Sequence, residues 1–163
     1  MQAVQITALL LVAAAWAFAL AHAAEYPGKM RLERDDYLAT QTIYYPGFTI
    51  GGASEPLAIV ALVALLALTP ADGPQFWLIL LALIATVLTH AIFWLMTQPV
   101  NRTWTKGIEL SGAGARFFQT GGKTGDAEWT RLRDRWERSH IYRTAVMSAA
   151  LVALAIAVTM PLG

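Results

Sequence analysis

The sequence predicts an all-helical integral membrane protein, a bundle of four transmembrane helices that forms one domain, residues 1–163. Of the 163 residues, 56% are hydrophobic and only 14% are charged, whereas about a quarter of the residues in a soluble domain are charged. Four apolar runs each reach the roughly 20 residues that a helix needs to cross a hydrocarbon core. Cysteine is absent, which excludes disulfides, thiolate metal sites and thiol nucleophiles.

The first predicted span covers residues 3–23, which are apolar except for Gln5, Thr7 and His22. Ala21-His22-Ala23 has the small residues of a signal-peptidase cleavage site. However, no lysine or arginine precedes the run, and secretory signals normally carry one there. We therefore expect a retained transmembrane helix.

A polar connection, residues 24–47, follows the first span. Five of its residues recur at helical spacing, and three of them are tyrosines: Tyr37, Leu38, Gln41, Tyr44 and Tyr45. Such a face suits the headgroup layer of a membrane, where amphipathic rings settle. We expect a short amphipathic helix that lies along the membrane surface and ends at Pro46-Gly47.

The second predicted span, residues 48–69, carries Glu55 as its one charged residue. Pro56 disfavours helical geometry at the residue before it, so the span is either one kinked helix from about residue 48 or a short helix from residue 55. The short helix would reach about 22 Å at 1.5 Å per residue, less than the roughly 30 Å of a hydrocarbon core. We expect the kinked helix.

The third predicted span, residues 75–98, is uncharged apart from His90, and Pro99 is expected to bend or end it. The second long connection, residues 99–137, begins there. Its stretch 105–125 contains six glycines, which predicts an irregular loop.

The fourth predicted span, residues 138–160, belongs to a helix that begins in the preceding connection, because no glycine or proline occurs between Asp126 and Pro161. One face of this helix carries side chains at steps of three and four. They are Trp129, Leu132, Trp136, His140 and Arg143. We expect this face to look into the protein.

The basic residues predict the orientation. Three of the twelve lie in connection 24–47, none lies between the second and third spans, and eight lie from Arg102 to Arg138. By the positive-inside rule both long connections face the cytoplasm and both termini lie outside it, in what we expect to be a bacterial inner membrane. The arginines from Arg131 to Arg138 are expected to contact anionic membrane lipid and not nucleic acid.

With this orientation the polar side chains of the four spans fall at one depth, in the cytoplasmic third of the bundle. They are the three histidines of the chain and the one acid embedded in a span: His22, Glu55, His90 and His140. Lipid cannot satisfy such groups, so they should face the bundle interior. Three interpretations remain open.

The first interpretation is a metal centre. Two helices carry a histidine and a glutamate three residues apart, and the other two carry one ligand each. The six candidate ligands are His22, Glu25, Glu55, His90, Glu137 and His140. Di-metal sites of four-helix bundles use comparable pairs plus two further carboxylates. Iron is the favoured metal, because histidine and carboxylate ligands with an open position suit oxygen chemistry.

The second interpretation is a structural network, because buried charges need partners whatever the function. Its expected pairs are Glu55 with Arg143 and His90 with Asn101. The third is a metal-free pocket, in which a histidine acts as general base on an acidic aromatic substrate that enters from the lipid. Three tryptophans would help to bind the rings, namely Trp94, Trp104 and Trp136.

Four short motifs follow the chain: His22-x-x-Glu25-x-Pro27-x-Lys29, Tyr37-x-x-x-Gln41-x-x-Tyr44, Pro99-Val-Asn101-Arg102 and Trp136-x-x-x-His140-x-x-Arg143. They resemble motifs of the small anthrone oxygenase-like membrane proteins. The resemblance extends over nearly the whole chain and implies a four-helix membrane fold. It also implies oxygenation of an anthrone to an anthraquinone, generally described without a metal or flavin. The glycine-rich stretch 105–125 departs from the family pattern.

We therefore expect a membrane oxidoreductase that acts on a lipid-soluble aromatic or quinone-like molecule. His140 and His90 would be the bases, and Arg143 or Asn101 would stabilise a developing oxyanion. The first His/Glu pair would orient the substrate or bind the metal. The alternative is a non-catalytic accessory subunit that binds a larger membrane complex through its alanine-rich faces and its cytoplasmic loop. The expected protein partners are such a complex or further copies of this chain.

Overall fold

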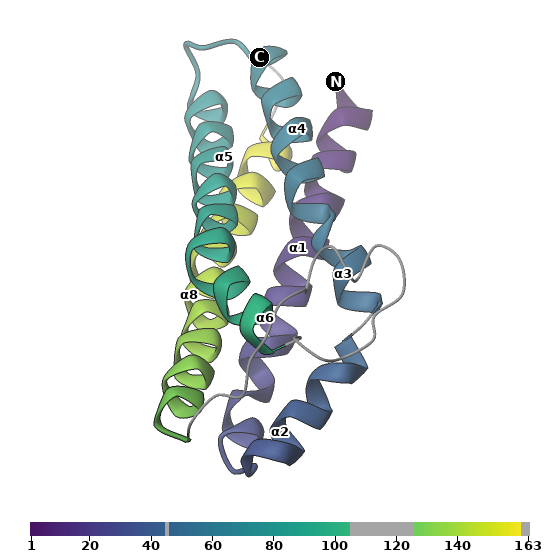
Figure 1. The fold of residues 1–163 in the computed structure, drawn as a ribbon. Coiled ribbons are helices and arrows are strands. Elements are labelled where there is room, and N and C mark those ends of the chain that lie inside the picture. Colours follow the sequence, from purple (N-terminus) through teal and green to yellow (C-terminus); the bar gives the residue numbers. More distant parts are fainter. Residues whose placement is uncertain (45, 105–125, 161–163) are drawn as a thin grey trace.

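The computed structural model describes residues 1–44, 46–104 and 126–160, and across these ranges the secondary structure is helical, without strands. Four helical segments are long and apolar enough to cross a membrane. They run side by side along the molecule, with both termini at the same end (Figure 1). The predicted all-helical bundle of four spans is confirmed, and the protein is an integral membrane protein. The predicted loop 105–125 lies outside the described residues.

α1 (Gln2–Lys29) is longer than the predicted span 3–23, because it continues through Pro27. Hydropathy marks the part of a helix that lies in lipid, whereas the last turns of α1 are polar and still pack against the protein. His22 and Lys29, which lie in these turns, are both buried. The first connection therefore begins at Met30.

α2 (Arg34–Gln41) and the 3-10 turn η1 (Thr42–Tyr44) form the short helix predicted in the first connection. The prediction that its tyrosines lie in the headgroup layer is wrong for two of the three, and Tyr45 lies outside the described residues. Tyr37 and Tyr44 are both buried inside the protein. The helix folds back over the end of the bundle, where glutamates of α1 and α8 accept hydrogen bonds from the two phenols.

The second span consists of α3 (Gly47–Gly52) and α4 (Ser54–Ala67), which meet at Ala53. Pro56 explains the break, because it has no N–H to donate to the carbonyl of Gly52. Together the two helices cover 21 residues and can cross a membrane. The structure thus contains the interrupted long helix that the sequence favours over a short one.

The third span begins with α5 (Pro74–Ile92), continues as the π-helical segment η2 (Phe93–Thr97) and ends with α6 (Gln98–Trp104). Pro99 therefore does not end the helix. Proline cannot donate to the carbonyl four residues earlier, that of Leu95, and Arg135 Nη2 donates to it instead at 2.6 Å. The π-helical turn before Pro99 accommodates the change in hydrogen-bond pattern.

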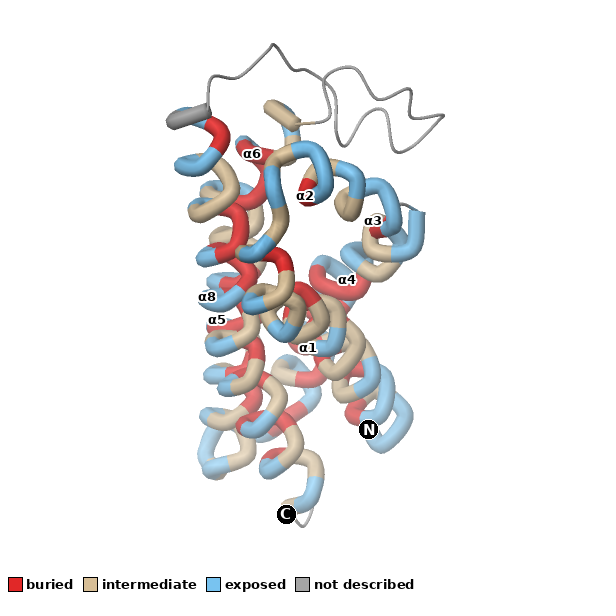
Figure 2. Tube along the Cα trace, turned by 90° about the horizontal axis from the view of Figure 1, so that it is seen from below, coloured by how far each residue is buried: buried red, intermediate tan, exposed pale blue. Residues whose placement is uncertain are grey.

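α8 (Asp126–Thr159) is the single long helix that the sequence predicts. It packs along α5 and α1, and α4 packs against the same two helices. Buried positions recur along the inner side of each long helix, whereas the outer sides are exposed (Figure 2). The four spans thus form a closed bundle with one shared interior.

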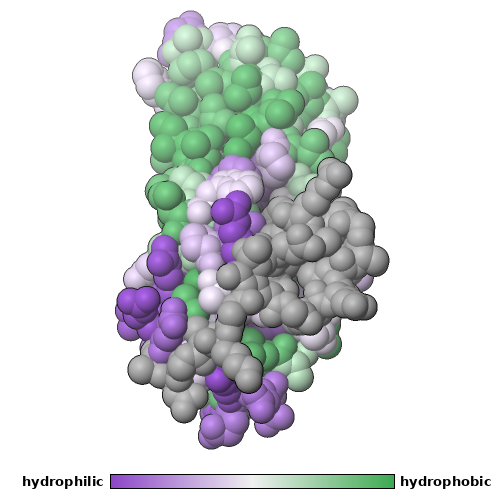
Figure 3. Space-filling view, viewed as in Figure 1, coloured by the Kyte–Doolittle hydropathy of each residue, from purple (hydrophilic) through white to green (hydrophobic). Residues whose placement is uncertain are grey.

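The bundle has two halves with different cores. We call the half that holds the termini the apolar half, because its core consists of aliphatic and alanine side chains such as Ala8, Leu62 and Leu154. The polar half holds α2, α3, α6 and the first half of α8, and its buried core includes Tyr44 and Trp136. The surface follows the same division, with a hydrophobic band over the apolar half and hydrophilic residues toward the other end (Figure 3).

Candidate functional site

The polar half encloses a cavity of about 750 Å³, with walls from all four spans and from η1. All four residues predicted as catalytic line it: His90, Asn101, His140 and Arg143. Two further predicted metal ligands, His22 and Glu55, also line the cavity, whereas the last two, Glu25 and Glu137, lie outside the lining. The four residues predicted as catalytic thus lie around one cavity, together with two of the predicted metal ligands.

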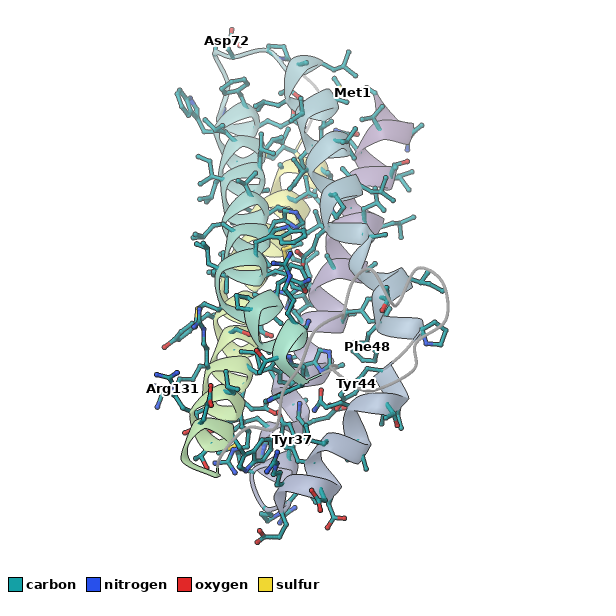
Figure 4. The ribbon with its side chains drawn as sticks, in the orientation of Figure 1. Met1, Tyr37, Tyr44, Phe48, Asp72 and Arg131 are labelled. Atoms are coloured by element: carbon teal, nitrogen blue, oxygen red, sulfur yellow. The ribbon has the colours of Figure 1, made fainter. Side chains whose placement is uncertain are left out.

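Aromatic rings form much of the cavity wall. Tyr44 and Phe48, from the short segments after α2, face the bundle (Figure 4), and their ring centroids lie 4.9 Å apart. Phe48 also contacts the ring of Phe18 on α1 at 5.1 Å. Gly51 permits this closure of α3 on α1, because a Cβ at this position would overlap the ring of Phe18.

Two histidines contact each other in the cavity wall. The rings of His22 on α1 and His140 on α8 have centroids 4.2 Å apart. Trp136, one turn before His140, contacts both, with centroid distances of 4.2 Å to His140 and 5.0 Å to His22. The close approach depends on α1, whose buried alanines Ala15 and Ala19 leave room for the neighbouring helices.

Glu55 pairs with Arg143, as the structural-network interpretation predicts. Its other oxygen, Oε2, lies 3.1 Å from His90 Nδ1, and the indole N–H of Trp94 donates to His90 Nε2 at 3.0 Å. Both nitrogens of His90 are therefore occupied, with the proton on Nδ1. The second predicted pair is wrong, because Asn101 Oδ1 accepts from the indole N–H of Trp136 at 2.8 Å.

Arg143 also fixes the tautomer of His140. Its Nη1 lies 3.3 Å from His140 Nδ1, and because a guanidinium group can only donate, Nδ1 must accept. The proton of the neutral ring then lies on Nε2. His140 therefore presents an N–H donor.

Several residues of the cavity lining carry hydrogen-bond donors that are unused. Four buried side-chain N–H groups of its lining have no hydrogen-bond partner among the described residues. They are Gln41 Nε2, Trp104 Nε1, His140 Nε2 and Arg143 Nε. A buried donor without a partner costs about 1–3 kcal/mol. A ligand with acceptor oxygens would recover that cost.

A second polar cluster lies directly behind the cavity wall. Lys29 Nζ lies 3.2 Å from Glu137 Oε1 and 3.5 Å from Glu25 Oε2, and 4.6 Å from the ring centroid of Trp136. Tyr37 donates to Glu137 at 2.6 Å. Burial and the adjacent Glu137 carboxylate raise the pKa of the Tyr37 phenol above its ordinary value, so it remains a donor.

Tyr44 completes this cluster by donating to Glu25. Burial, followed by the hydrogen bond to Glu25, raises the pKa of the Tyr44 phenol. Sequence reasoning missed Lys29 and both phenols as parts of the site. The sequence did contain one indication of their role. Lys29 follows His22 by seven residues, and Tyr44 follows Tyr37 by seven, a spacing that places the two members of each pair on one helical face.

The six predicted metal ligands do not converge. Glu55 contacts His90 and Arg143, whereas Glu25 and Glu137 contact Lys29. Within the described ranges no group of three or more histidine or acidic side chains is placed to hold a metal ion. Arginine and lysine occupy the positions beside the carboxylates that a di-metal centre would need.

Comparison with known proteins adds one result to this geometry. The family model of the anthrone oxygenases matches residues 41–153. No match was found among curated proteins, and none among solved structures. The matched segment contains the second and third spans, most of the fourth and, among the cavity residues, Glu55, His90, His140 and Arg143. This protein belongs to the anthrone oxygenase family.

Proposed function

We propose that this protein is a membrane oxidoreductase that binds a fused-ring aromatic ketone of the anthrone type in the cavity and oxidises it with O2. The observation that carries the proposal is the donor-rich lining of an aromatic cavity between the spans. Aromatic walls suit a flat, lipid-soluble ligand. Unused N–H donors suit its carbonyl and phenolic oxygens.

The size of the cavity supports a ligand of this class. Its volume of about 750 Å³ lies within the range of roughly 300–1,000 Å³ that is usual for small-molecule sites. Trp94 is half exposed at the rim, on the lipid-facing side of the third span. A substrate dissolved in the membrane would reach the cavity without passing through water.

In the first step His22 takes a proton from the ring CH2 opposite the ketone. No hydrogen bond of His22 is found among the described residues, and its Nδ1 lies 3.9 Å from Glu25 Oε2, beyond hydrogen-bond distance. In contrast, both nitrogens of His90 are occupied and His140 Nε2 carries a proton. We therefore assign the base to His22 and not to His140 or His90. Negative charge develops on the ketone oxygen, where the N–H of His140 and the positive charge of Arg143 stabilise it.

In the second step the resulting carbanion gives its electrons to O2. A C–O bond forms at the same carbon, its second C–H bond breaks, and the O–O bond breaks as water leaves. Overall, one ring CH2 and one O2 become one ring C=O and one H2O. The ring carbon is oxidised and dioxygen is reduced. The buried cavity keeps bulk water away from the reactive carbanion.

The test uses purified protein in detergent with anthrone as substrate, and follows O2 consumption together with formation of anthraquinone. Replacing the base, His22→Ala, should lower turnover by roughly 10²–10⁴-fold. Replacing an oxyanion donor, His140→Ala, should lower it by roughly 10²–10³-fold. Thr89→Val is the matched control, because Thr89 is buried, bonds within α5 and lies outside the cavity lining.

Binding is measured separately by quenching of tryptophan fluorescence. His22→Ala should still bind anthrone, since the base acts only during the reaction. Wild-type turnover in His22→Ala would overturn the assigned base. A folded wild-type protein that neither binds anthrone nor consumes O2 would overturn the proposal and favour the non-catalytic subunit. Elemental analysis of the same sample tests the iron prediction, which requires near-stoichiometric iron that is lost in His22→Ala.

We also propose that the polar half faces the cytoplasm of a bacterial cell and that both termini lie outside it. The positive-inside rule supports this orientation. Because the chain has no cysteine, single substitutions report it cleanly. Asp72→Cys, between the second and third spans, should react with an impermeant maleimide in intact spheroplasts, whereas Asp36→Cys should react only after lysis. The reverse labelling pattern would contradict the orientation.

A further inference from the structure

We infer that this protein has a binding site for the phosphate of an anionic membrane phospholipid, on the outer face of α8 beside η2. The site is a groove of about 500 Å³ that is separate from the cavity. Three arginines of α8 line it, namely Arg131, Arg135 and Arg138. The inference does not depend on the proposed enzymatic function.

The three arginines form one positively charged stripe. Their spacing of four and three residues places them on the same face of α8, and all three are exposed. Arg131 projects away from the bundle at the end of α8 (Figure 4). The cations therefore point outward, to where a membrane lipid can reach them.

The one acid in the groove does not oppose an anion. Asp134 lies within the lining, but Arg133 Nε and Nη2 donate to its Oδ1 at 3.2 and 3.0 Å. These two hydrogen bonds to one carboxylate oxygen offset the charge of Asp134 and leave the three lining arginines as the net charge of the groove. Arg135 is held in place by its hydrogen bond to the Leu95 carbonyl at 2.6 Å.

The position of the groove favours a lipid over a free phosphate ion. On the membrane side it is bordered by Met96 and Tyr142. Tyr142 is 48% exposed and neighbouring Leu95 is 69% exposed. An anion seated on the arginines would therefore have apolar surface directly below it, where acyl chains can lie. Free phosphate could use the arginines but not this surface.

The experiment measures phospholipid binding to the full chain in detergent by native mass spectrometry, with phosphatidylglycerol as the anionic probe and phosphatidylcholine as the zwitterionic one. The test variant Arg131→Gln/Arg138→Gln leaves Arg135 and its structural hydrogen bond intact. The control variant Arg31→Gln/Arg102→Gln removes two exposed arginines elsewhere in the polar half. Both variants lose the same net charge.

We expect the test variant to bind phosphatidylglycerol about 30-fold more weakly than wild type, which corresponds to about 1 kcal/mol for each arginine. The control variant should change affinity less than about threefold. If the two variants lost the same affinity for phosphatidylglycerol, the lipid would be attracted by the overall positive charge and not by a defined site, which would overturn the inference. Equal binding of the two lipids, or full competition by equimolar inorganic phosphate, would overturn the lipid headgroup as the ligand.

Discussion

The two halves of the bundle hold their helices together by different interactions, apolar packing in one half and polar contacts in the other. In the apolar half, a buried hydroxyl such as that of Thr86 bonds to a carbonyl of its own helix, and the contacts between helices are mainly alanine and aliphatic side chains. In the polar half, charged and aromatic side chains of different helices bond to one another around an open cavity. The same four helices thus provide a packed scaffold at one end and a site at the other.

The difference has an energetic consequence. Lipid tails are as apolar as leucine, so helices in the apolar half gain little from burying apolar surface and depend on close packing. The groups of the polar half have no alternative partner in lipid. Removing one partner there leaves a buried charge, which costs more than a packing defect. We therefore expect substitutions in the polar half to cost more stability and also to abolish the function.

The largest effect should follow from breaking the Glu55–Arg143 pair. Arg143→Met leaves the Glu55 carboxylate buried with only His90 beside it. Loss of one partner of a buried pair costs about 3–5 kcal/mol. We expect this loss in the free energy of unfolding in mixed micelles, together with loss of anthrone binding.

The double variant Glu55→Gln/Arg143→Met separates charge from packing. Because it removes the unpaired carboxylate, it should recover at least half of the lost stability while binding stays impaired. A double variant as unstable as Arg143→Met would contradict the view that the unpaired charge dominates the cost.

A smaller effect is expected in the apolar half. Leu62 on α4 is fully buried in the aliphatic core and lies outside the cavity lining. Leu62→Ala creates a cavity and should lower the free energy of unfolding by about 2 kcal/mol. This is the low end for such substitutions, because in lipid the loss of buried apolar surface contributes little and the cavity itself makes up most of the cost. Turnover per folded molecule should equal that of wild type. A parallel loss of turnover would show that the halves are not independent.

A third effect concerns alkaline pH. The raised pKa of Tyr37 means that, above about pH 10, the unfolded chain releases a proton that the folded chain retains. The unfolded state then binds fewer protons, so stability falls as pH rises. Tyr37→Phe should reduce this slope by up to about 1.4 kcal/mol per pH unit. The free energy of unfolding is compared between pH 9 and 11.

The slope is the diagnostic quantity, because Tyr37→Phe also removes the hydrogen bond to Glu137 at every pH. Tyr142→Phe removes a phenol from an exposed position and serves as the control. An unchanged alkaline slope in Tyr37→Phe would contradict the burial of this phenol in the folded protein.

The fate of Tyr37 also shows where sequence reasoning stops. Hydropathy and helical spacing predicted the four spans, the continuous α8 and the level at which His22, His90 and His140 lie, because each depends on one helix at a time. α2 has the composition of a surface helix. Its burial depends on Glu137, 100 residues away, and one helical pattern contains no information on that contact.

The six predicted metal ligands do not come together in the structure, and the reason is related. The spacing of Glu137 and His140 places both on one face of α8, but it does not determine which cation approaches the carboxylate. In the structure that cation is Lys29. Likewise, His140 is a donor at Nε2 because Arg143 Nη1 donates to its Nδ1. The residue types alone do not reveal this contact.

The smallest predicted effect compares one substitution in both halves. Trp16 joins α1 to α8 in the apolar half by donating to Ser148 Oγ at 2.9 Å, and Ser148 still donates to the carbonyl of Thr144. Trp16→Phe should therefore cost only about 0.6 kcal/mol, the average for such bonds in membranes. The same change at Trp136 removes the bond to Asn101 and a wall of the cavity, and should cost at least twice as much. Equal costs would mean that lipid-embedded hydrogen bonds stabilise both halves alike.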